Sequence, residues 1–250
     1  MVADPTAVAS VPQGQDRSAS GADRLAQIRQ ICDAIPSRVT VMAVTKNFPP
    51  EQVRLAYAAG IRDFGENRIQ EAIPKQEALA DLQDVTWHFI GRLQGNKARK
   101  AIEHFDWIHS VDSLKLAERL QRLGESLGRS ITLSLQVKLR SDPTKGGWLE
   151  PELWEALPTL EKYSKLHIKG LMIIPPRNLP AAEILKVFED GQRLFQDLQN
   201  YQASQQNSIF EIQQLSMGMS GDYVQAIEKG STMVRLGSLL FGDRLPVSPP

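Results

Sequence analysis

Residues 107–137 read WIHSVDSLKLAERLQRLGESLGRSITLSLQV, a stretch whose hydrophobic period changes twice. It begins with the apolar run Trp107–Ser110 and ends with the longer run Ile131–Val137, and both are typical of short buried strands. Between them, leucines recur at spacings of three and four, as on one face of an amphipathic helix: Leu116, Leu120, Leu123 and Leu127. The stretch therefore predicts a strand, a helix and a second strand, the repeating unit of parallel sheets.

The same alternation runs through most of the chain. Eight apolar runs are candidate strands: Val39–Thr45, Ile61–Phe64, Thr86–Ile90, Trp107–Ser110, Ile131–Val137, Ile168–Ile173, Phe210–Leu215 and Thr232–Leu236. Helices are expected between and after them, at about 51–60, 67–82, 94–104, 113–127, 151–163, 181–202, 221–229 and Ser238–Phe241. We expect Pro74 to kink the helix drawn over 67–82.

Eight strand–helix units in about 230 residues predict an α/β protein with a single (β/α)8 barrel of TIM type. An open doubly wound sheet is the alternative. Such a sheet usually needs fewer strands, and no GxGxxG follows the first strand, so we favour the barrel.

The two ends of the chain differ from its middle. Residues 1–20 are small and polar with two prolines, and we expect a disordered tail there. Residues 21–250 then form one barrel domain, in which Leu25, Ile28 and Cys32 predict an extra N-terminal helix. Because the barrel uses the chain to about residue 244, we expect no second β domain.

Composition and charge exclude several classes of protein. Hydrophobic residues make up 42% of the 250 and charged residues 23%, as in globular proteins with one substantial core. Lys+Arg 29 balance Asp+Glu 29, so nucleic acid or anionic lipid could bind only at a local patch, and we expect neither as a partner. No apolar run is long enough to span a membrane, and no secretory signal pattern opens the chain.

The single cysteine, Cys32, fits a reducing compartment, so we expect a cytoplasmic protein. No amphipathic stretch is left over for oligomerisation, which predicts a monomer.

The first candidate strand reads VTVMAVTK and places Lys46 at its carboxyl end, where barrel enzymes carry their chemistry. Partial burial lowers the pKa of a lysine and frees the amine to form a Schiff base with a carbonyl compound. The alternative is an ordinary exposed lysine at a strand end.

Two loops suggest a phosphate site. LSMGMSGDY (215–223) and VRLGSLLFG (234–242) place glycines and serines between a strand and a helix, on the seventh and eighth loops where barrel enzymes hold phosphate. Gly237 and Ser238 belong to the second loop and Ser216 to the first. The alternative is that these glycine turns only cap helices.

Arg235 lies between apolar neighbours at the end of the eighth strand, and a buried cation there requires a partner. A pyridine nitrogen is one candidate, and a carboxylate, Asp222 or Glu66, is the other. Asn67 follows the second strand at a turn, from which its amide can reach a ligand or cap a helix.

Histidines give no sign of a metal site. His88 lies within a candidate strand, where a single histidine is more often a hydrogen-bonded core residue than a catalyst. His104, His109 and His167 show no metal-ligand spacing, so we expect no bound metal.

Six motifs in this order carry a resemblance to a known family: Lys46, GEN (65–67), WHFIGRLQGNK (87–97), GLMIIPP (170–176), LSMGMSGDY (215–223) and VRLGSLLFG (234–242). From about residue 22 to residue 244, the chain resembles the pyridoxal-phosphate homeostasis proteins (the YggS/PROSC family), which are similar to the barrel domain of alanine racemase. The resemblance implies a type III fold for binding pyridoxal 5′-phosphate (PLP): a barrel with an extra N-terminal helix.

By position, the resemblance implies a PLP site. Lys46 would form the internal aldimine, a Schiff base, and Arg235 would face the pyridine nitrogen. The residues that would hold the phosphate are Ser216, Gly237 and Ser238, and those beside the ring are Asn67 and Met172.

Two places depart from the family pattern or lack a role. Lys138 stands where many relatives have an asparagine, which leaves open the chemistry of that part of the barrel end where the strands terminate. Lys145 and Gly147 keep a Lys-x-Gly element whose role is unassigned.

The resemblance implies a protein of intracellular PLP (vitamin B6) homeostasis. An arginine at the ring nitrogen would keep it unprotonated and make the ring a poorer electron sink. Racemisation also needs an acid or base opposite the lysine, which racemases resembling this barrel take from a second domain. We therefore expect a PLP carrier or regulator rather than an enzyme, with PLP-dependent apoenzymes as recipients. The alternatives are a low-activity PLP-dependent amino-acid racemase and a Schiff-base aldolase.

Overall fold

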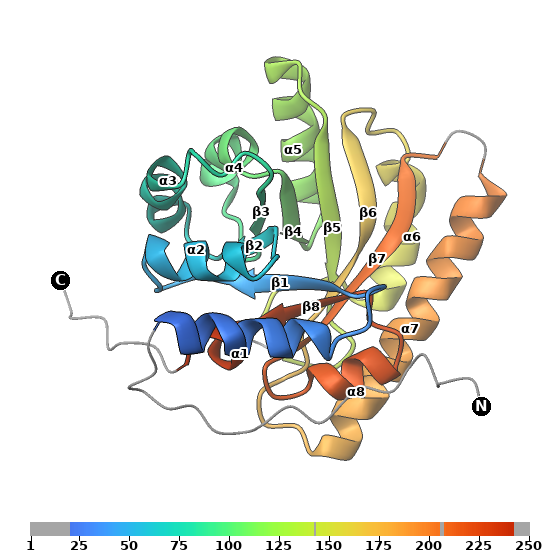
Figure 1. Ribbon diagram of the computed structural model, residues 1–250. Coiled ribbons are helices and arrows are strands. Elements are labelled where there is room, and N and C mark those ends of the chain that lie inside the picture. Colours follow the sequence, from blue (N-terminus) through green and yellow to red (C-terminus); the bar gives the residue numbers. More distant parts are fainter. Residues whose placement is uncertain (1–20, 143, 206–207, 243–250) are drawn as a thin grey trace.

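The computed structural model describes residues 21–142, 144–205 and 208–242. The tail expected over 1–20 and the last residues, 243–250, lie outside these ranges. Within them, eight parallel strands pair in sequence order and β8 pairs with β1, which closes the sheet (Figure 1). The predicted (β/α)8 barrel is confirmed.

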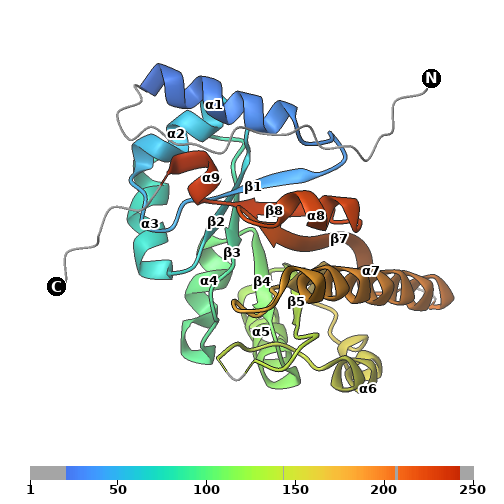
Figure 2. The ribbon, with the colours of Figure 1, turned by 90° about the horizontal axis from the view of Figure 1, so that it is seen from below.

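The strands are β1 Thr40–Val44, β2 Asp63–Glu66, β3 Thr86–Phe89, β4 Trp107–Val111, β5 Ile131–Val137, β6 Leu166–Ile173, β7 Phe210–Met219 and β8 Met233–Leu236. The helices are α1 Gly21–Asp33, α2 Pro50–Ala58, α3 Ile69–Ala78, the 3-10 turn η1 Gly95–Lys97, α4 Ala98–His104, α5 Leu114–Leu127, α6 Glu150–Leu160, α7 Ala181–Ser204, α8 Tyr223–Glu228 and α9 Ser238–Phe241. The expected N-terminal helix is α1, which packs on α2 and α9 (Figure 2).

The strand predictions hold best where both faces are covered. The strand over Ile131–Val137 is confirmed residue for residue. The second strand is wrong by two residues, because Gly60 takes a φ of 102° and lets Ile61 N donate to Ala56 O at 3.0 Å, so that Ile61 closes the end of α2. The seventh strand continues past Leu215 to Met219, since Ser216 and Met219 still pair with β8.

Two helix predictions also need correction. The helix expected over 67–82 is the shorter α3, which continues past Pro74 and ends at Ala78. The helix expected over 94–104 is divided into η1 and α4. The last helix, Ser238–Phe241, is confirmed.

Apolar side chains form two clusters. The larger cluster joins β3–β7 to the helices beside them and includes Phe188, whereas the smaller one joins β1, β2 and β8 to α1, α2 and α9 around Phe64 and Ile28. Across the described ranges, no helix has the length and apolar character needed to cross a membrane. Because all eight strands are parallel, their carboxyl ends meet at one end of the barrel, called the mouth below.

Candidate functional site

All seven residues that the sequence predicts to bind a ligand lie at or near the mouth. Lys46 lies two residues beyond β1, Asn67 directly follows β2, and Gly237 follows β8. The other four lie near the carboxyl ends of β6, β7 and β8 or at the start of α9: Met172, Ser216, Arg235 and Ser238. Met172 and Ser216 are register partners, and a Cβ on Gly237 would lie 3.4 Å from Val44 O. Segments far apart in sequence therefore form one site, while the binding role of each residue stays a prediction.

A buried polar cluster fixes the end of β1 beside Lys46. Thr45 Oγ1 donates to Glu66 Oε1 at 2.7 Å, and Lys75 Nζ donates to Thr45 O at 2.7 Å. Lys75 and Glu66 form an ion pair from which water is almost excluded, since Glu66 is 0% and Lys75 6% exposed. Asn47, directly after Lys46, takes a left-handed φ of 64°, a conformation that asparagine tolerates. The backbone at Lys46 thus lies between a residue fixed by hydrogen bonds and a residue in a left-handed conformation.

Lys75 is a residue that the sequence analysis missed. Its partner is nine positions away and comes from a different element, so no short motif links the two. The available signal was its place on α3: Ile69, Ala72 and Lys75 are spaced by three and share the buried face. A lysine on the apolar stripe of a helix needs a buried partner.

Arg235 has a different kind of environment. It is 4% exposed, and its Nη1 donates to both the carbonyl oxygen and Oγ of Ser216 at 2.7 Å. Its Nη2 donates to Ile173 O at 2.9 Å. Neither of the proposed carboxylate partners accepts a hydrogen bond from it: Glu66 pairs with Lys75, and Asp222 Oδ1 accepts from Met219 N at 2.6 Å. In the described part of the chain, every oxygen that accepts a hydrogen bond from Arg235 is therefore neutral.

Burial lowers the pKa of Arg235 to about 10, while Asp222 acts in the opposite direction. The guanidinium consequently keeps its charge at neutral pH. Three of its five N–H donors are used by Ser216 and Ile173 within the described ranges. The mouth thus holds a desolvated cation with donors to spare.

Unpartnered polar atoms gather on the same side of the barrel. Six buried side-chain atoms in the described residues make no hydrogen bond, and four of them come from β2, β4 and the residue after β2: Glu66 Oε2, Asn67 Oδ1, His109 Nδ1 and Ser110 Oγ. Buried polar atoms are nearly always hydrogen-bonded, so such a concentration suggests that a ligand or water completes the site. Asn67 Oδ1 fits the prediction that this side chain meets a ligand.

The loops after β7 and β8 are joined by a serine. Ser220 Oγ accepts from the backbone N–H groups of Gly237 and Leu239, both at 3.2 Å. The prediction that Ser216 lies in this turn is wrong, because β7 runs to Met219 and Ser216 lies inside the strand, hydrogen-bonded to Arg235. Ser220, which was predicted to lie in the same turn, does lie after β7, and its hydroxyl is the one that meets the loop after β8.

Two histidines form a chain inside the barrel. His88 bonds with both ring nitrogens, to His109 Nε2 at 2.8 Å and to Asp63 Oδ1 at 2.9 Å, so its prediction as a hydrogen-bonded core residue is confirmed. Burial holds the pKa of His109 well below its usual range, with smaller effects of His88 and Arg235 in the same direction. Over the described residues, no group of three or more His, Cys, Asp or Glu side chains is placed to hold a metal ion.

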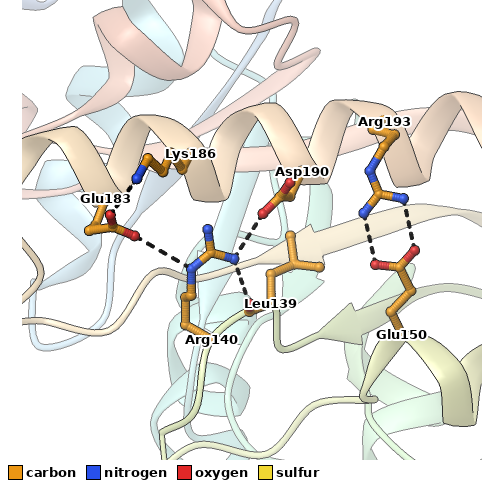
Figure 3. A network of polar contacts seen from close by, with 7 residues as sticks. All are labelled: Leu139, Arg140, Glu150, Glu183, Lys186, Asp190 and Arg193. Carbon is orange, nitrogen blue, oxygen red and sulfur yellow. Dashed lines mark hydrogen bonds and ion pairs between the residues drawn. The ribbon is translucent and has the colours of Figure 1, made fainter.

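The loop between β5 and α6 and the first residue of α6 are held against α7 by ion pairs (Figure 3). Arg140 Nη1 donates to Asp190 Oδ2 at 2.8 Å, and Arg193 meets both carboxylate oxygens of Glu150 at 2.9 Å. On the same loop, Lys145 Nζ donates to Pro175 O at 2.7 Å, beside the end of β6. A Cβ on Gly147 would lie 3.0 Å from Lys138 Cβ, so this glycine allows the loop to pass close to Lys138. Lys145 and Gly147 therefore have structural roles in this loop.

Comparison with known proteins identifies the family of the chain and supports its fold. Residues 22–245 match the family described as alanine racemase, N-terminal domain. The chain is 50% identical over 217 residues to the pyridoxal phosphate homeostasis protein of Synechocystis sp., which covers 86% of this chain and 96% of that relative.

Solved structures give the same result. PipY of Synechococcus elongatus PCC7942, solved with PLP bound, is similar with a TM-score of 0.79 and 48% identity over 89% of this chain and 100% of that one. An alanine racemase of Clostridium difficile 630 has a TM-score of 0.68 at 15% identity, covering 89% of this chain and 55% of that one. At that identity the similarity concerns the fold alone.

Proposed function

The chain belongs to the pyridoxal phosphate homeostasis protein family, and we propose that it binds pyridoxal 5′-phosphate for intracellular vitamin B6 homeostasis. We propose further that Lys46 holds the cofactor as a Schiff base and that the protein lacks efficient catalysis. The observation that carries the proposal is Arg235, a buried cation with neutral partners at the same end of the barrel as Lys46.

The residues of the mouth fit the groups of PLP. Lys46 offers an amine at the end of β1, and Asn67 offers a buried, unpartnered acceptor beside it in the mouth. The proposed phosphate site is formed by Gly237, Ser238 and Ser220, where small side chains and backbone N–H groups suit an anion. Ser216 acts mainly through Arg235, and Met172, fully buried in β6, gives the ring an apolar neighbour.

When bound, PLP supplies an aldehyde that condenses with amines and a ring that can withdraw electrons. Lys46 contributes the amine, and the Thr45–Glu66–Lys75 cluster fixes the backbone from which it projects. Ser216 and Ile173 orient the guanidinium of Arg235. Because a guanidinium donates hydrogen bonds and accepts none, Arg235 would leave a pyridine nitrogen without a proton. An unprotonated ring withdraws electrons weakly, and this supports binding without efficient catalysis.

The test is the visible absorption of the protein mixed with PLP. We expect a Schiff-base band that Lys46→Ala abolishes, because no other amine takes the place of Lys46 at the end of β1. Lys138→Ala is the matched control, since it also removes a partly buried lysine near a strand end, and it should keep the band. Borohydride reduction followed by peptide mass spectrometry should place the cofactor on Lys46. A wild-type protein that stays colourless with excess PLP would contradict the proposal.

The same preparation distinguishes the other functions considered. A racemase would destroy the optical rotation of an amino acid faster than free PLP does, and we expect no such acceleration. A Schiff-base aldolase would yield a sugar-phosphate adduct on borohydride trapping instead of the cofactor.

We propose in addition that the protein is a cytoplasmic monomer that delivers PLP to PLP-dependent apoenzymes. In support of a monomer, Leu149 and Met219 are the only large hydrophobic side chains exposed among the described residues. Cys32 is a free thiol, as in a reducing compartment. Light scattering on a sizing column tests the oligomeric state, and PLP transfer to an apoenzyme, measured by the recovery of its activity, tests delivery.

A further inference from the structure

A groove of about 620 Å³ lies between the loop after β3 and the helix α5. One wall carries Arg92, three residues beyond β3, and the other carries Lys115, Arg119 and Arg122 of α5. The groove is near the carboxyl ends of β3 and β4, yet none of its lining residues belongs to the proposed PLP site. It is therefore a separate feature on the same end of the barrel.

The cations of the groove are unusually free of partners. Arg92, Lys115 and Arg119 are exposed and make no hydrogen bond or ion pair with any residue that the structure describes, whereas Arg122 pairs with Glu118. Two carboxylates, Asp112 and Glu118, share the groove with four cations, so its formal charge is positive. In a chain with a net charge of +0, this is the kind of local basic patch that overall composition conceals.

The end of the groove adds backbone donors. α5 has 14 residues and begins beside the groove at Leu114, directly after Ser113, whose side chain makes no capping hydrogen bond to the first turn. The first N–H groups of a helix have no partner within the helix, and the positive end of its dipole favours an anion. The buried side chains of Leu93 and Leu116 form an apolar part of the lining.

We propose that this groove binds a small organic phosphate, a phosphate monoester that carries an apolar ring. A guanidinium group binds phosphate oxygens in pairs, and Arg92 and Arg119 line the groove from two different elements, the loop after β3 and α5. The volume lies within the range of about 300–1,000 Å³ that small-ligand sites occupy. Leu93 and Leu116 suit the ring. The proposal is independent of PLP binding in the barrel.

A compact ligand fits better than an acidic protein segment. Asp112 and Glu118 share the groove with the cations, so an extended acidic chain that fills the groove would also meet like charges. A single phosphate group needs only the part of the groove near Arg92, Lys115 and Arg119.

Calorimetric titration of the full chain, loaded with PLP to fill the barrel and then desalted to remove free PLP, tests the proposal. The probe is adenosine 5′-monophosphate, with adenosine and inorganic phosphate in parallel. We expect the monophosphate to bind more tightly than either, more weakly at high salt, and about tenfold more weakly to Lys115→Gln/Arg119→Gln. The matched control, Arg38→Gln/Lys100→Gln, removes one exposed arginine and one exposed lysine outside the groove and should bind like the wild type.

Three results would overturn the proposal as a whole, and a fourth would overturn the part that concerns the ring. The first is no heat of binding with the monophosphate, and the second is equal affinity in the groove variant and the wild type, which would place the ligand elsewhere. The third is tighter binding of hexaglutamate than of the monophosphate, lost in the groove variant, which would assign the groove to an acidic protein segment. If inorganic phosphate and the monophosphate bound with equal affinity, the groove would recognise phosphate alone, and the proposed contact with a ring would be wrong. Titration of the protein without PLP shows whether the outcome depends on the barrel site, so failure of the groove and failure of PLP binding are distinguishable.

Discussion

Two buried cations stand at the mouth of this barrel, and they are stabilised in different ways. Lys75 has a carboxylate partner, Glu66, and the pair is closed off by Thr45. Arg235 is as deeply buried, yet within the described ranges its hydrogen bonds go only to the carbonyl oxygens of Ser216 and Ile173 and to the hydroxyl of Ser216. A buried charge that is paired with an opposite charge of the protein has a structural role. A buried charge that is surrounded only by neutral dipoles can still attract an opposite charge or an acceptor on a ligand.

The largest effect is expected where the balanced pair is broken. Glu66→Gln leaves Lys75 buried without a counter-charge, so the free energy of unfolding should fall by about 3–5 kcal/mol. Urea unfolding followed by circular dichroism measures this. Glu66→Gln/Lys75→Met removes both charges and should recover most of the loss. Glu71→Gln on the surface of α3, which breaks only the pair with Arg68, should have a small effect; a loss as large as that of Glu66→Gln would contradict the distinction between the two pairs.

Arg235→Met should cost less, roughly 2–3 kcal/mol of unfolding free energy, because it strands two carbonyl oxygens but also removes a desolvated charge. Its larger consequence should be functional, with PLP retained less well and an altered absorption band. Equilibrium dialysis against PLP together with urea unfolding separates the two effects. If Arg235→Met destabilised the protein more than Glu66→Gln while PLP affinity stayed unchanged, Arg235 would be part of the scaffold after all.

Gly91→Ala tests how closely the backbone around the mouth is packed. A Cβ there would lie 2.1 Å from Asn67 O, so the loop after β2 must move, and we expect a loss of about 1–2 kcal/mol and weaker PLP binding. Gly221→Ala is the matched control, since nothing lies within 4 Å of a Cβ at that position. If the two variants had the same free energy of unfolding and the same PLP affinity, close packing at Gly91 would be contradicted.

The smallest effect is expected on the pH dependence of the free energy of unfolding. Because burial holds the pKa of His109 well below its usual value, the unfolded chain takes up a proton below about pH 6.5 that the folded protein does not. This contribution to stability is complete above about pH 6.5 and should decline towards about pH 5 by at most about 1.4 kcal/mol per pH unit. His109→Gln should flatten the slope, whereas His167→Gln on the surface should keep it. An unchanged slope in His109→Gln would assign the acid sensitivity to other groups.

The sequence predicts the repeating part of this molecule better than its exceptions. Strands such as Ile131–Val137 are covered on both faces, so burial gives them a continuous apolar pattern that can be read directly. Ile61 is equally apolar but closes a helix, because the hydrogen bonds of the backbone, which the pattern does not encode, decide its place.

The candidate site is predictable only in part, for a related reason. Motif order brings Lys46, Asn67 and Gly237 to strand ends, and barrel closure then places them together. Other contacts join elements that meet only in the folded protein, so no local spacing in the sequence predicts them. These are the ion pair of Glu66 with Lys75 and the two hydrogen bonds to Ser220. The groove of α5 is hidden for another reason, since a neutral total charge says nothing of how charges are distributed.

The hydroxyl of Ser220 has a consequence for the release of a ligand. It accepts from Gly237 N and Leu239 N, N–H groups of the kind that an anion on this loop would need. On the proposed function, departure of the phosphate would exchange one acceptor for another rather than strand buried donors, because the serine can rotate into its place. The free energy difference between loaded and unloaded protein is thereby reduced, which suits a molecule that gives its cofactor away more than one that must keep it.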